Sequence, residues 1–274
     1  MSLSLSRNIP RIDRRAAEAR RQSTLASADY AVVGQALQIV GEELCNTLDL
    51  RQDARVLDVA VGNGHASLAA ARRWCDVIAT DFAPDLANRS RQRGEAEHLG
   101  VRFVEGDAEA LPFADQTFDA VVSTFGAMFT PDQDRAASEM IRVCRRGGLV
   151  GLANWTPRGF IGQLFAALGK HAPTTGNSPF LWGTNERLQE LFGVYGSVWV
   201  TRKQVAFRCS SAAEWVDQFG ASYIPVLKTF ARLDADQQRA LRSELLELVA
   251  HFNRAKDRTM VVDAEYVEVV VKRR

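Results

Sequence analysis

Residues 55 to 155 alternate short apolar runs with longer stretches of helical pattern, and this alternation limits the fold more than any other feature of the sequence. The runs are rich in valine, leucine and alanine, as is typical of strands covered on both faces. Strands separated by helices of this length pair in parallel through right-handed crossovers. The pattern therefore predicts an α/β fold with a doubly wound, mostly parallel sheet. Its expected strands are 55–61, 76–81, 101–107, 118–125 and 149–155, and its expected helices are 65–74, 83–100 and 131–148.

After residue 156 the pattern changes and becomes mainly helical. We expect a late strand hairpin at the edge of the sheet, formed by 197–208 and 259–274, with amphipathic helices inserted between its strands. The further helices are expected at 158–172, 185–193, 212–232 and 235–256. The chain has 274 residues and shows no internal repeat, so a single domain 1–274 is expected. Its expected parts are N-terminal helices with a lid in 1–50, a core in 51–156 and a helical elaboration in 157–274.

The formal net charge of the chain is +1, so no general attraction to nucleic acid or to an anionic membrane is expected. No apolar stretch approaches the roughly 20 residues that a membrane-spanning helix needs, and the charged N-terminus lacks the apolar core of a signal peptide. The arginine-rich segment 7–21 has no aromatic residue for base stacking, which favours a solvated helix over an RNA-binding arm. The four cysteines are widely spaced, as is typical of a reduced, cytoplasmic protein.

The segment VLDVAVGNG, residues 56–64, ends the first expected strand with two glycines and precedes a helix. A loop in this position brings backbone N–H groups and the positive end of a helix to the carboxyl edge of the sheet, and glycine lets a ligand lie against the chain. A dinucleotide, a phosphate, S-adenosylmethionine or simply a tight turn would suit it. The dinucleotide fingerprint G-x-G-x-x-G is incomplete, because Ala60 takes the first position and the third glycine is missing.

Acidic residues accompany three successive expected strands: Asp58 lies within the first, Asp81 ends the second and Asp107 follows the third. Since the carboxyl ends of parallel strands share one edge of a sheet, these carboxylates are expected to line one crevice. A carboxylate at Asp81 can accept bonds from both hydroxyls of a ribose, a contact that nicotinamide enzymes also use. The end of the fourth strand, within 118–129, adds small polar and aromatic side chains close to the first strand.

Four ordered motifs resemble those of class I S-adenosylmethionine-dependent methyltransferases: VLDVAVGNG, ATD, GDAEALPFADQTFDAVVS and RVCRRGGLVGLANW. They are most similar to the branch that includes the ubiquinone and menaquinone biosynthesis enzymes and many small-molecule methyltransferases of secondary metabolism. The resemblance covers about residues 50–156. It implies a Rossmann-like sheet of seven strands with an antiparallel last strand. It also implies S-adenosylmethionine as the methyl donor and S-adenosylhomocysteine as the product.

The resemblance further implies contacts between these motifs and the cofactor. Gly62 and Gly64 would lie against its methionine part, Asp81 would hold the ribose, and Asp107 would accept a bond from the adenine amino group. The complete set of implied cofactor-binding residues is Asp58, Ala60, Gly62, Gly64, Asp81, Phe82, Asp107, Ala108, Ser123 and Thr124.

Two residues depart from the family pattern. Ala60 takes the place of the usual first glycine, so the turn there must keep φ negative or carry strain. Arg146 replaces the usual proline before Gly147 and Gly148, a change expected to be confined to a surface turn. Neither change removes a side chain that would contact the cofactor.

The acceptor pocket is expected beyond the fourth and fifth strands. Its candidate residues are Tyr30, Phe125, Met128, Phe129, Trp155 and Phe160, with Trp182 as a further one. Ordinary core packing is the alternative for each, and Tyr30 is also a candidate lid residue. His171 is the weak candidate for an acceptor-side base, although many acceptors need none. His65 would either touch the cofactor carboxylate or face solvent. No His, Cys, Asp and Glu cluster has metal-ligand spacing, so no metal is expected.

These patterns predict a cytoplasmic enzyme that transfers a methyl group from S-adenosylmethionine to a small, partly apolar organic acceptor by in-line displacement. The alternative is a non-catalytic regulatory or assembly protein that binds the same cofactor on the same fold. A nicotinamide oxidoreductase is disfavoured by the missing third glycine. Neither nucleic acid nor a membrane is an expected partner, and a homodimer formed through the apolar C-terminal strand is a further expectation.

Overall fold

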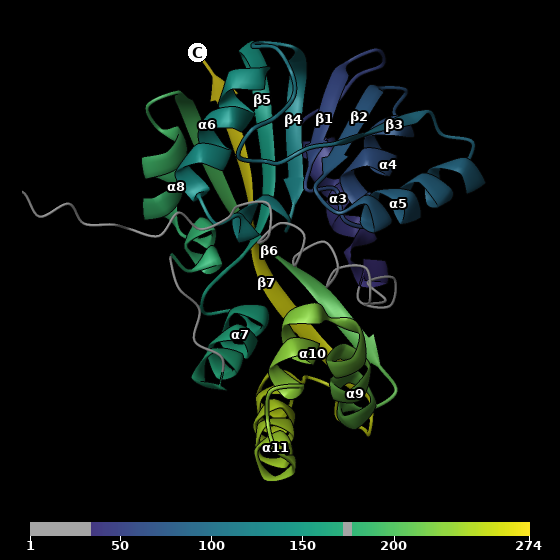
Figure 1. Ribbon diagram of the computed structural model, residues 1–274, viewed down its shortest axis with the longest axis vertical. Coiled ribbons are helices and arrows are strands. Elements are labelled where there is room, and N and C mark those ends of the chain that lie inside the picture. Colours follow the sequence, from purple (N-terminus) through teal and green to yellow (C-terminus); the bar gives the residue numbers. More distant parts are fainter. Residues whose placement is uncertain (1–33, 172–176) are drawn as a thin grey trace, which may run out of the picture.

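The computed structural model describes residues 34–171 and 177–274, and its centre is a seven-stranded sheet in the order β3-β2-β1-β4-β5-β7-β6 (Figure 1). Strands β1 to β5 pair in parallel, whereas β7 pairs antiparallel with both β5 and β6. The strands are β1 (Arg55–Val59), β2 (Asp76–Asp81), β3 (Val101–Glu105), β4 (Phe118–Thr124), β5 (Cys144–Trp155), β6 (Gly196–Cys209) and β7 (Met260–Arg273). The predicted doubly wound, mostly parallel sheet of seven strands with an antiparallel last strand is confirmed.

Helices cover both faces of this sheet, as its apolar strands require. On one face Val122 of β4 shares a buried cluster with Leu44, and on the other face Val121 packs with Met140. The first face carries α3 (Gln38–Thr47), α4 (His65–Ala71) and α5 (Pro84–Ala96), and the second carries α6 (Gln133–Val143) and α8 (Asn185–Phe192). Short 3-10 turns are η1 (Gln35–Leu37), η2 (Ala127–Phe129) and η3 (Pro179–Gly183).

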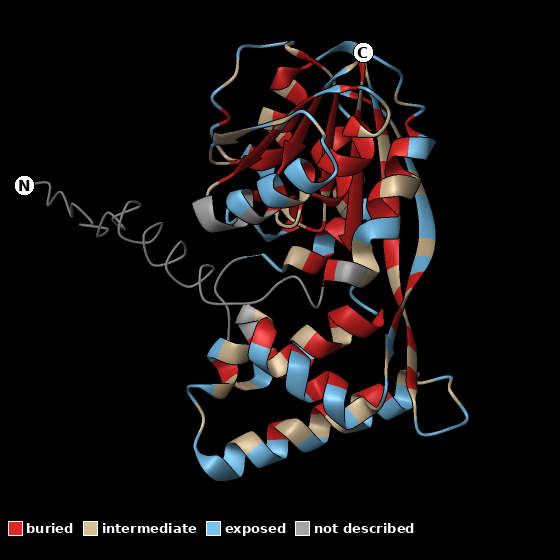
Figure 2. Cartoon of the chain, turned by 90° about the vertical axis from the view of Figure 1, so that its right-hand side faces the viewer, coloured by how far each residue is buried: buried red, intermediate tan, exposed pale blue. Residues whose placement is uncertain are grey.

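A further group of helices lies beyond the carboxyl ends of the parallel strands (Figures 1 and 2). It consists of α7 (Phe160–His171), α9 (Ala212–Ser222), α10 (Ile224–Phe230) and α11 (Ala235–Phe252). Phe160 packs against the rings of Trp215 and Phe252, with ring centroids 5.2 and 5.5 Å apart. Because α9 to α11 are inserted between β6 and β7, the predicted late hairpin with helices between its strands is confirmed.

Among the predicted boundaries that differ from the structure, two have clear local reasons. The expected helix 131–148 ends at Val143, and β5 already begins at Cys144, whose partner is Phe118 across an irregular register. The expected helix 212–232 is interrupted at Tyr223, which is extended, with Pro225 in the first turn of the next helix. A proline has no N–H to continue a preceding helix, so α10 begins anew there.

The closing strand β7 lies inside the sheet and not at its edge. One edge of β7 pairs with Leu149 to Trp155 of β5. The other edge pairs with β6 along the whole length of β7. Residues Tyr266 to Lys272 are thus paired on both edges, whereas Met260 to Glu265 pair in the sheet with β6 alone. A homodimer that involves this strand stays a prediction. Within 34–171 and 177–274, no helix is both long and apolar enough to cross a bilayer.

Candidate functional site: the carboxyl ends of β1 to β4

The loop from β1 to α4 exposes bare main chain at Gly62. A Cβ added to Gly62 would meet no described atom within 4 Å, so the backbone there borders open space. Gly62 and Gly64 both lie in the left-handed region, with φ of +50° and +77°, which favours glycine. Ser90 of α5 donates from Oγ to the Gly62 carbonyl at 2.6 Å, and this bond fixes the loop. The predicted glycine loop thus has the geometry that a ligand lying against the chain requires.

Ala60 in the same loop also has a positive φ, +55°. The turn therefore does not keep φ negative at this residue, and it carries the strain that was the other alternative. Replacing Ala60 with glycine is expected to raise the free energy of unfolding by about 1 kcal/mol, because glycine adopts this conformation without steric cost. Urea unfolding measures the change. The same replacement at Ala70, inside α4, serves as the control and is expected to lower stability by about 1 kcal/mol. An unchanged or lowered stability of Ala60→Gly would contradict the strain.

Asp58 of β1, the strand that leads into this loop, is completely buried. Its Oδ2 accepts from the backbone N–H and the hydroxyl of Ser67, at 2.9 and 2.6 Å. Its Oδ1 has no hydrogen-bond partner among the described residues. Burial, and to a smaller extent the charge of Asp81, raises the pKa of Asp58 to about 7. A buried carboxylate with a free oxygen is suited to a cationic or hydrogen-bond-donating ligand.

Two further buried polar atoms near the loop also lack a partner among the described residues: Thr80 Oγ1 and His65 Nε2. His65 is 7% exposed, so the alternative in which it faces solvent is wrong. Burial, with the charge of Arg93, lowers the pKa of His65 to about 4, so its ring is neutral at pH 7. Arg93 donates to the Asn63 carbonyl at 2.6 Å and lies 3.4 Å from His65 Nδ1. Ser90 and Arg93 could not be predicted from the sequence, because nothing in a helical pattern marks which polar residue faces a neighbouring loop.

Asp81 ends β2 and is 5% exposed. Its two carboxylate oxygens accept from the backbone N–H groups of Gly62 (3.1 Å) and Ala83 (2.9 Å). Burial raises the pKa of Asp81, although these N–H groups oppose the rise. Each oxygen keeps a lone pair for a further donor. The structure therefore joins Asp81 to the glycine loop, and its contact with a ribose stays a prediction.

Asp107 follows β3, the neighbour of β2 in the sheet, and so lies at the same edge as Asp81. Its Oδ1 accepts from the Glu109 N–H at 2.9 Å, which shapes the turn after β3. Asp107 and Phe82 are partly buried, and Ala108 is buried. The three predicted acids are thus brought to one edge of the sheet, and the roles of Phe82, Asp107 and Ala108 toward an adenine stay predictions.

Ser123 and Thr124 end β4, next to β1. The Ser123 hydroxyl donates to the Val59 carbonyl at 2.7 Å and accepts from the Ala127 N–H at 3.0 Å. Ser123 therefore ties β4 and η2 to β1 in this structure, while Thr124 is partly buried. Their contacts with a cofactor stay predictions.

An aromatic group stands at the ends of β4 and β5. Phe125 stacks on Trp155 with ring centroids 3.8 Å apart, and Tyr266 of β7 packs edge-on against Phe125 at 5.7 Å. Phe125 has φ of +59°, a strained value for a residue other than glycine. The Tyr266 hydroxyl donates to Glu43 of α3 at 3.1 Å. Tyr266 could not be predicted from the sequence, because only the fold shows that β7 lies beside β5.

The other acceptor candidates are placed differently. Phe129 is 37% exposed and packs against Phe165 and Phe180. Met128, Phe160 and Trp182 have no exposed surface, which matches core packing, their alternative interpretation. Tyr30 lies outside the described residues.

His171 ends α7 with its Nε2 3.8 Å from Glu244 of α11, so it borders the helices beyond the sheet. Its role as a base stays a prediction. In the described part of the chain, no group of three or more His, Cys, Asp or Glu side chains could hold a metal ion.

The sheet order and the loop after β1 are those of a class I methyltransferase, and a family model described as a methyltransferase domain matches residues 57–152. An uncharacterised protein of Mycobacterium tuberculosis is 34% identical over 250 residues, 85% of this chain and 91% of that protein. The demethylmenaquinone methyltransferase of Thermobifida fusca is 35% identical over 173 residues, 60% of this chain and 64% of that enzyme.

A solved structure shows the same fold. It is a phosphoethanolamine N-methyltransferase of Haemonchus contortus in complex with phosphomonomethylethanolamine and S-adenosylhomocysteine, with a TM-score of 0.55 and 16% identity. The match covers 86% of this chain and 53% of that chain. The chain belongs to the class I methyltransferase family, in the branch similar to the menaquinone and ubiquinone enzymes, and it is a methyltransferase.

Proposed function

We propose that this methyltransferase uses S-adenosylmethionine to methylate a small, partly apolar organic acceptor. The observation that carries the proposal is the open main chain at Gly62, in the loop that follows Asp58, a buried carboxylate with one oxygen that has no partner among the described residues. Such a site fits the methionine end of the cofactor, which carries an ammonium group that a carboxylate recognises. The family match and the solved neighbour that holds S-adenosylhomocysteine support this donor.

Different residues at the carboxyl ends of β1 to β3 would contact different parts of S-adenosylmethionine. Asp58 Oδ1 would accept from the ammonium group, Asp81 would accept from the ribose hydroxyls, and Asp107 with the Ala108 N–H would hold the adenine edge. The bound donor would supply an electrophilic methyl group on a sulfonium. Phe82 would cover the adenine face.

The acceptor side is formed by aromatic residues at the ends of β4 and β5. Phe125 and Trp155 would present an apolar wall that excludes water, and they would orient the acceptor in line with the methyl group. Tyr266 of β7 is almost fully buried and would support this wall from behind. Alignment of this kind supplies up to roughly 7–11 kcal/mol of the barrier, so a strong general base is not required for every acceptor. The similarity to a demethylmenaquinone methyltransferase supports a small-molecule acceptor.

Asp58 predicts how the binding of the cofactor depends on pH. The ammonium group of the cofactor favours the ionised form of the Asp58 carboxyl. In the protein without cofactor, burial raises the pKa of Asp58 to about 7. Below that pH, Asp58 must lose a proton before it pairs, so the affinity for S-adenosylmethionine is expected to fall as the pH drops, by up to about tenfold per unit. Calorimetric titrations across about pH 5.5 to 8.5 measure this slope, and Asp58→Asn should abolish it. A slope that is unchanged in Asp58→Asn would contradict the assignment.

Methyl transfer itself is tested with isotope-labelled S-adenosylmethionine and a panel of phenolic, amine, quinol and polyketide-like acceptors. We expect label in at least one acceptor, together with the release of S-adenosylhomocysteine. NAD serves as the competitor in the binding assay. Binding of NAD in place of S-adenosylmethionine would overturn the proposal, and so would labelled cofactor that stays bound without transfer to any acceptor.

The proposal also includes a cytoplasmic location for the enzyme. The four cysteines are free thiols and three of them are buried, which suits the reducing cytoplasm. The near-zero net charge favours a small-molecule acceptor over nucleic acid.

A further inference from the structure

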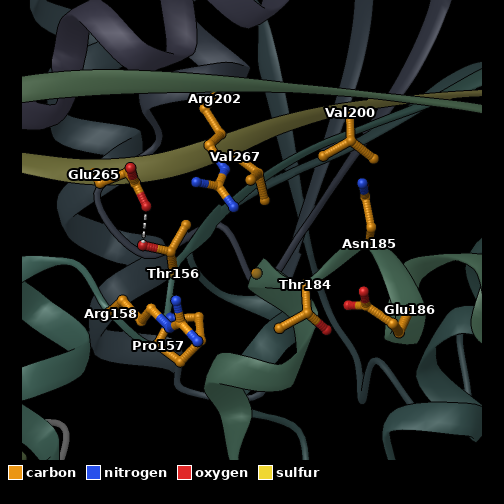
Figure 3. Close-up of a pocket in the computed structure, with 11 residues that line it drawn as sticks. Thr156, Pro157, Arg158, Thr184, Asn185, Glu186, Val200, Arg202, Glu265 and Val267 are labelled. Carbon is orange, nitrogen blue, oxygen red and sulfur yellow. Dashed lines mark hydrogen bonds between the residues drawn. The ribbon is translucent and has the colours of Figure 1, made fainter.

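A cavity of about 360 Å³ lies at the β6–β7 edge of the sheet (Figure 3). In the order of the strands, β4 and β5 separate this edge from β1 and its glycine loop. Its volume falls in the range of roughly 300–1,000 Å³ that small-molecule sites occupy. One wall is the segment that follows β5, another is the junction of η3 and α8, and the third is formed by β6 and β7. None of the residues assigned to the cofactor or the acceptor lines it.

Close backbone contacts and hydrogen bonds hold the walls of this cavity in place. A Cβ on Gly183 would lie 2.2 Å from the Trp155 carbonyl oxygen, so glycine is what lets η3 approach the end of β5. The Thr156 hydroxyl donates to Glu265 Oε1 at 2.7 Å and accepts from the Gly159 N–H at 3.2 Å. These bonds fix one Glu265 oxygen and leave the other for a further donor.

Four charged side chains of both signs line the cavity: Arg158, Arg202, Glu186 and Glu265. Salt bridges elsewhere on the surface join opposite charges, as Arg242 and Asp217 do at 2.9 Å. None of the four forms a salt bridge with another residue in the described part of the chain. Figure 3 shows the Arg202 guanidinium and the Glu265 carboxylate on one side of the cavity and Glu186 across from them. Arg158, Arg202 and Glu186 are exposed and Glu265 is partly buried, so all four charges remain accessible to a ligand.

An apolar strip completes the lining. Val200 and Val267 lie on the neighbouring strands β6 and β7 and face the cavity between the charged groups. A ligand that satisfies all of these surfaces needs a carboxylate for a guanidinium, an ammonium for a carboxylate and an apolar body. We propose that this cavity binds a zwitterionic amino acid with an apolar side chain, at a site separate from the cofactor crevice.

The test uses L-phenylalanine as the probe, titrated into the full chain in a calorimeter. Two analogues each lack one charge: 3-phenylpropionate has no ammonium group, and 2-phenylethylamine has no carboxylate. We expect saturable binding of phenylalanine with a Kd below about 1 mM, and binding of each analogue that is at least about tenfold weaker. Absence of saturable phenylalanine binding would overturn the proposal, as would an analogue that binds equally well.

Variants of residues that line the cavity test whether phenylalanine binds there. Arg202→Gln and Glu265→Gln should each weaken phenylalanine binding by about tenfold or more. Arg208→Gln on β6 and Glu247→Gln on α11 are matched controls outside the cavity, and they should leave it unchanged. An equal loss in the controls would contradict the site. Asp58→Asn separates the two proposals, because it alters the cofactor crevice and should not change phenylalanine binding. Loss of the probe in Asp58→Asn, with retention in Arg202→Gln, would place the amino acid in the crevice and overturn the separate site.

Discussion

Replacing Asp81 with asparagine is expected to weaken the binding of S-adenosylmethionine by about 100-fold or more. The carboxylate would accept two charge-assisted bonds from the ribose, each worth about 1.5–3 kcal/mol, and an asparagine offers one acceptor in their place. It also accepts from the Gly62 and Ala83 N–H groups, and an amide NH2 would face one of these donors. Both effects act in the same direction, and calorimetric titration measures their sum.

Asp76→Asn is the matched control for this variant. Asp76 begins the same strand, is largely exposed and pairs with Arg102 at 2.7 Å, an interaction worth at most about 1 kcal/mol. We expect its cofactor affinity to equal that of the unaltered protein. An Asp81→Asn protein that is folded and binds the cofactor with unchanged affinity would contradict the role of Asp81.

Replacing Gly126 with alanine is expected to lower the free energy of unfolding by about 3 kcal/mol. Gly126 has φ of −90° and ψ of −57°, values that any residue adopts, so the backbone conformation does not require glycine. The obstacle is steric: the new Cβ would lie 2.3 Å from the Ala60 carbonyl oxygen and 2.6 Å from the Ala60 Cβ. The loop after β1 would have to move away from β4, and cofactor affinity should fall with stability.

Urea unfolding of Gly126→Ala and of Gly169→Ala tests this close approach. Gly169 lies inside α7, where an added Cβ would meet no described atom within 4 Å. Alanine there should stabilise the protein by up to about 1 kcal/mol, because it favours the helix. If both variants changed stability by the same amount and in the same direction, the contact between Gly126 and Ala60 would be refuted as the cause.

The sequence predicted the sheet because its signal is local and repeated. Each strand from Arg55 to Trp155 is a short apolar run between helical stretches, and parallel pairing follows from that alternation. The glycine loop and the acids at 81 and 107 were placed at one edge for the same reason. Where β5 begins could not be predicted, because Cys144 pairs with Phe118 across an irregular register that only the folded sheet defines.

Contacts between distant segments account for what the sequence did not show. Ser90 reaches the Gly62 carbonyl from a different helix, and Tyr266 joins Phe125 and Trp155 from a strand more than 100 residues later. Local pattern likewise does not distinguish a pocket aromatic from a core aromatic, since both are apolar residues on the same element. Phe129, partly exposed, and Phe160, fully buried, could be separated only after the helices beyond the sheet were in place.

A crystal structure of the protein with S-adenosylhomocysteine addresses the central claim most directly. We predict the ribose hydroxyls at roughly 2.6–3.2 Å from the Asp81 carboxylate, with the amino-acid end over Gly62 and the adenine beside Asp107. A nucleoside bound anywhere else, or one that leaves Asp81 and Asp107 without contact to it, would contradict this account.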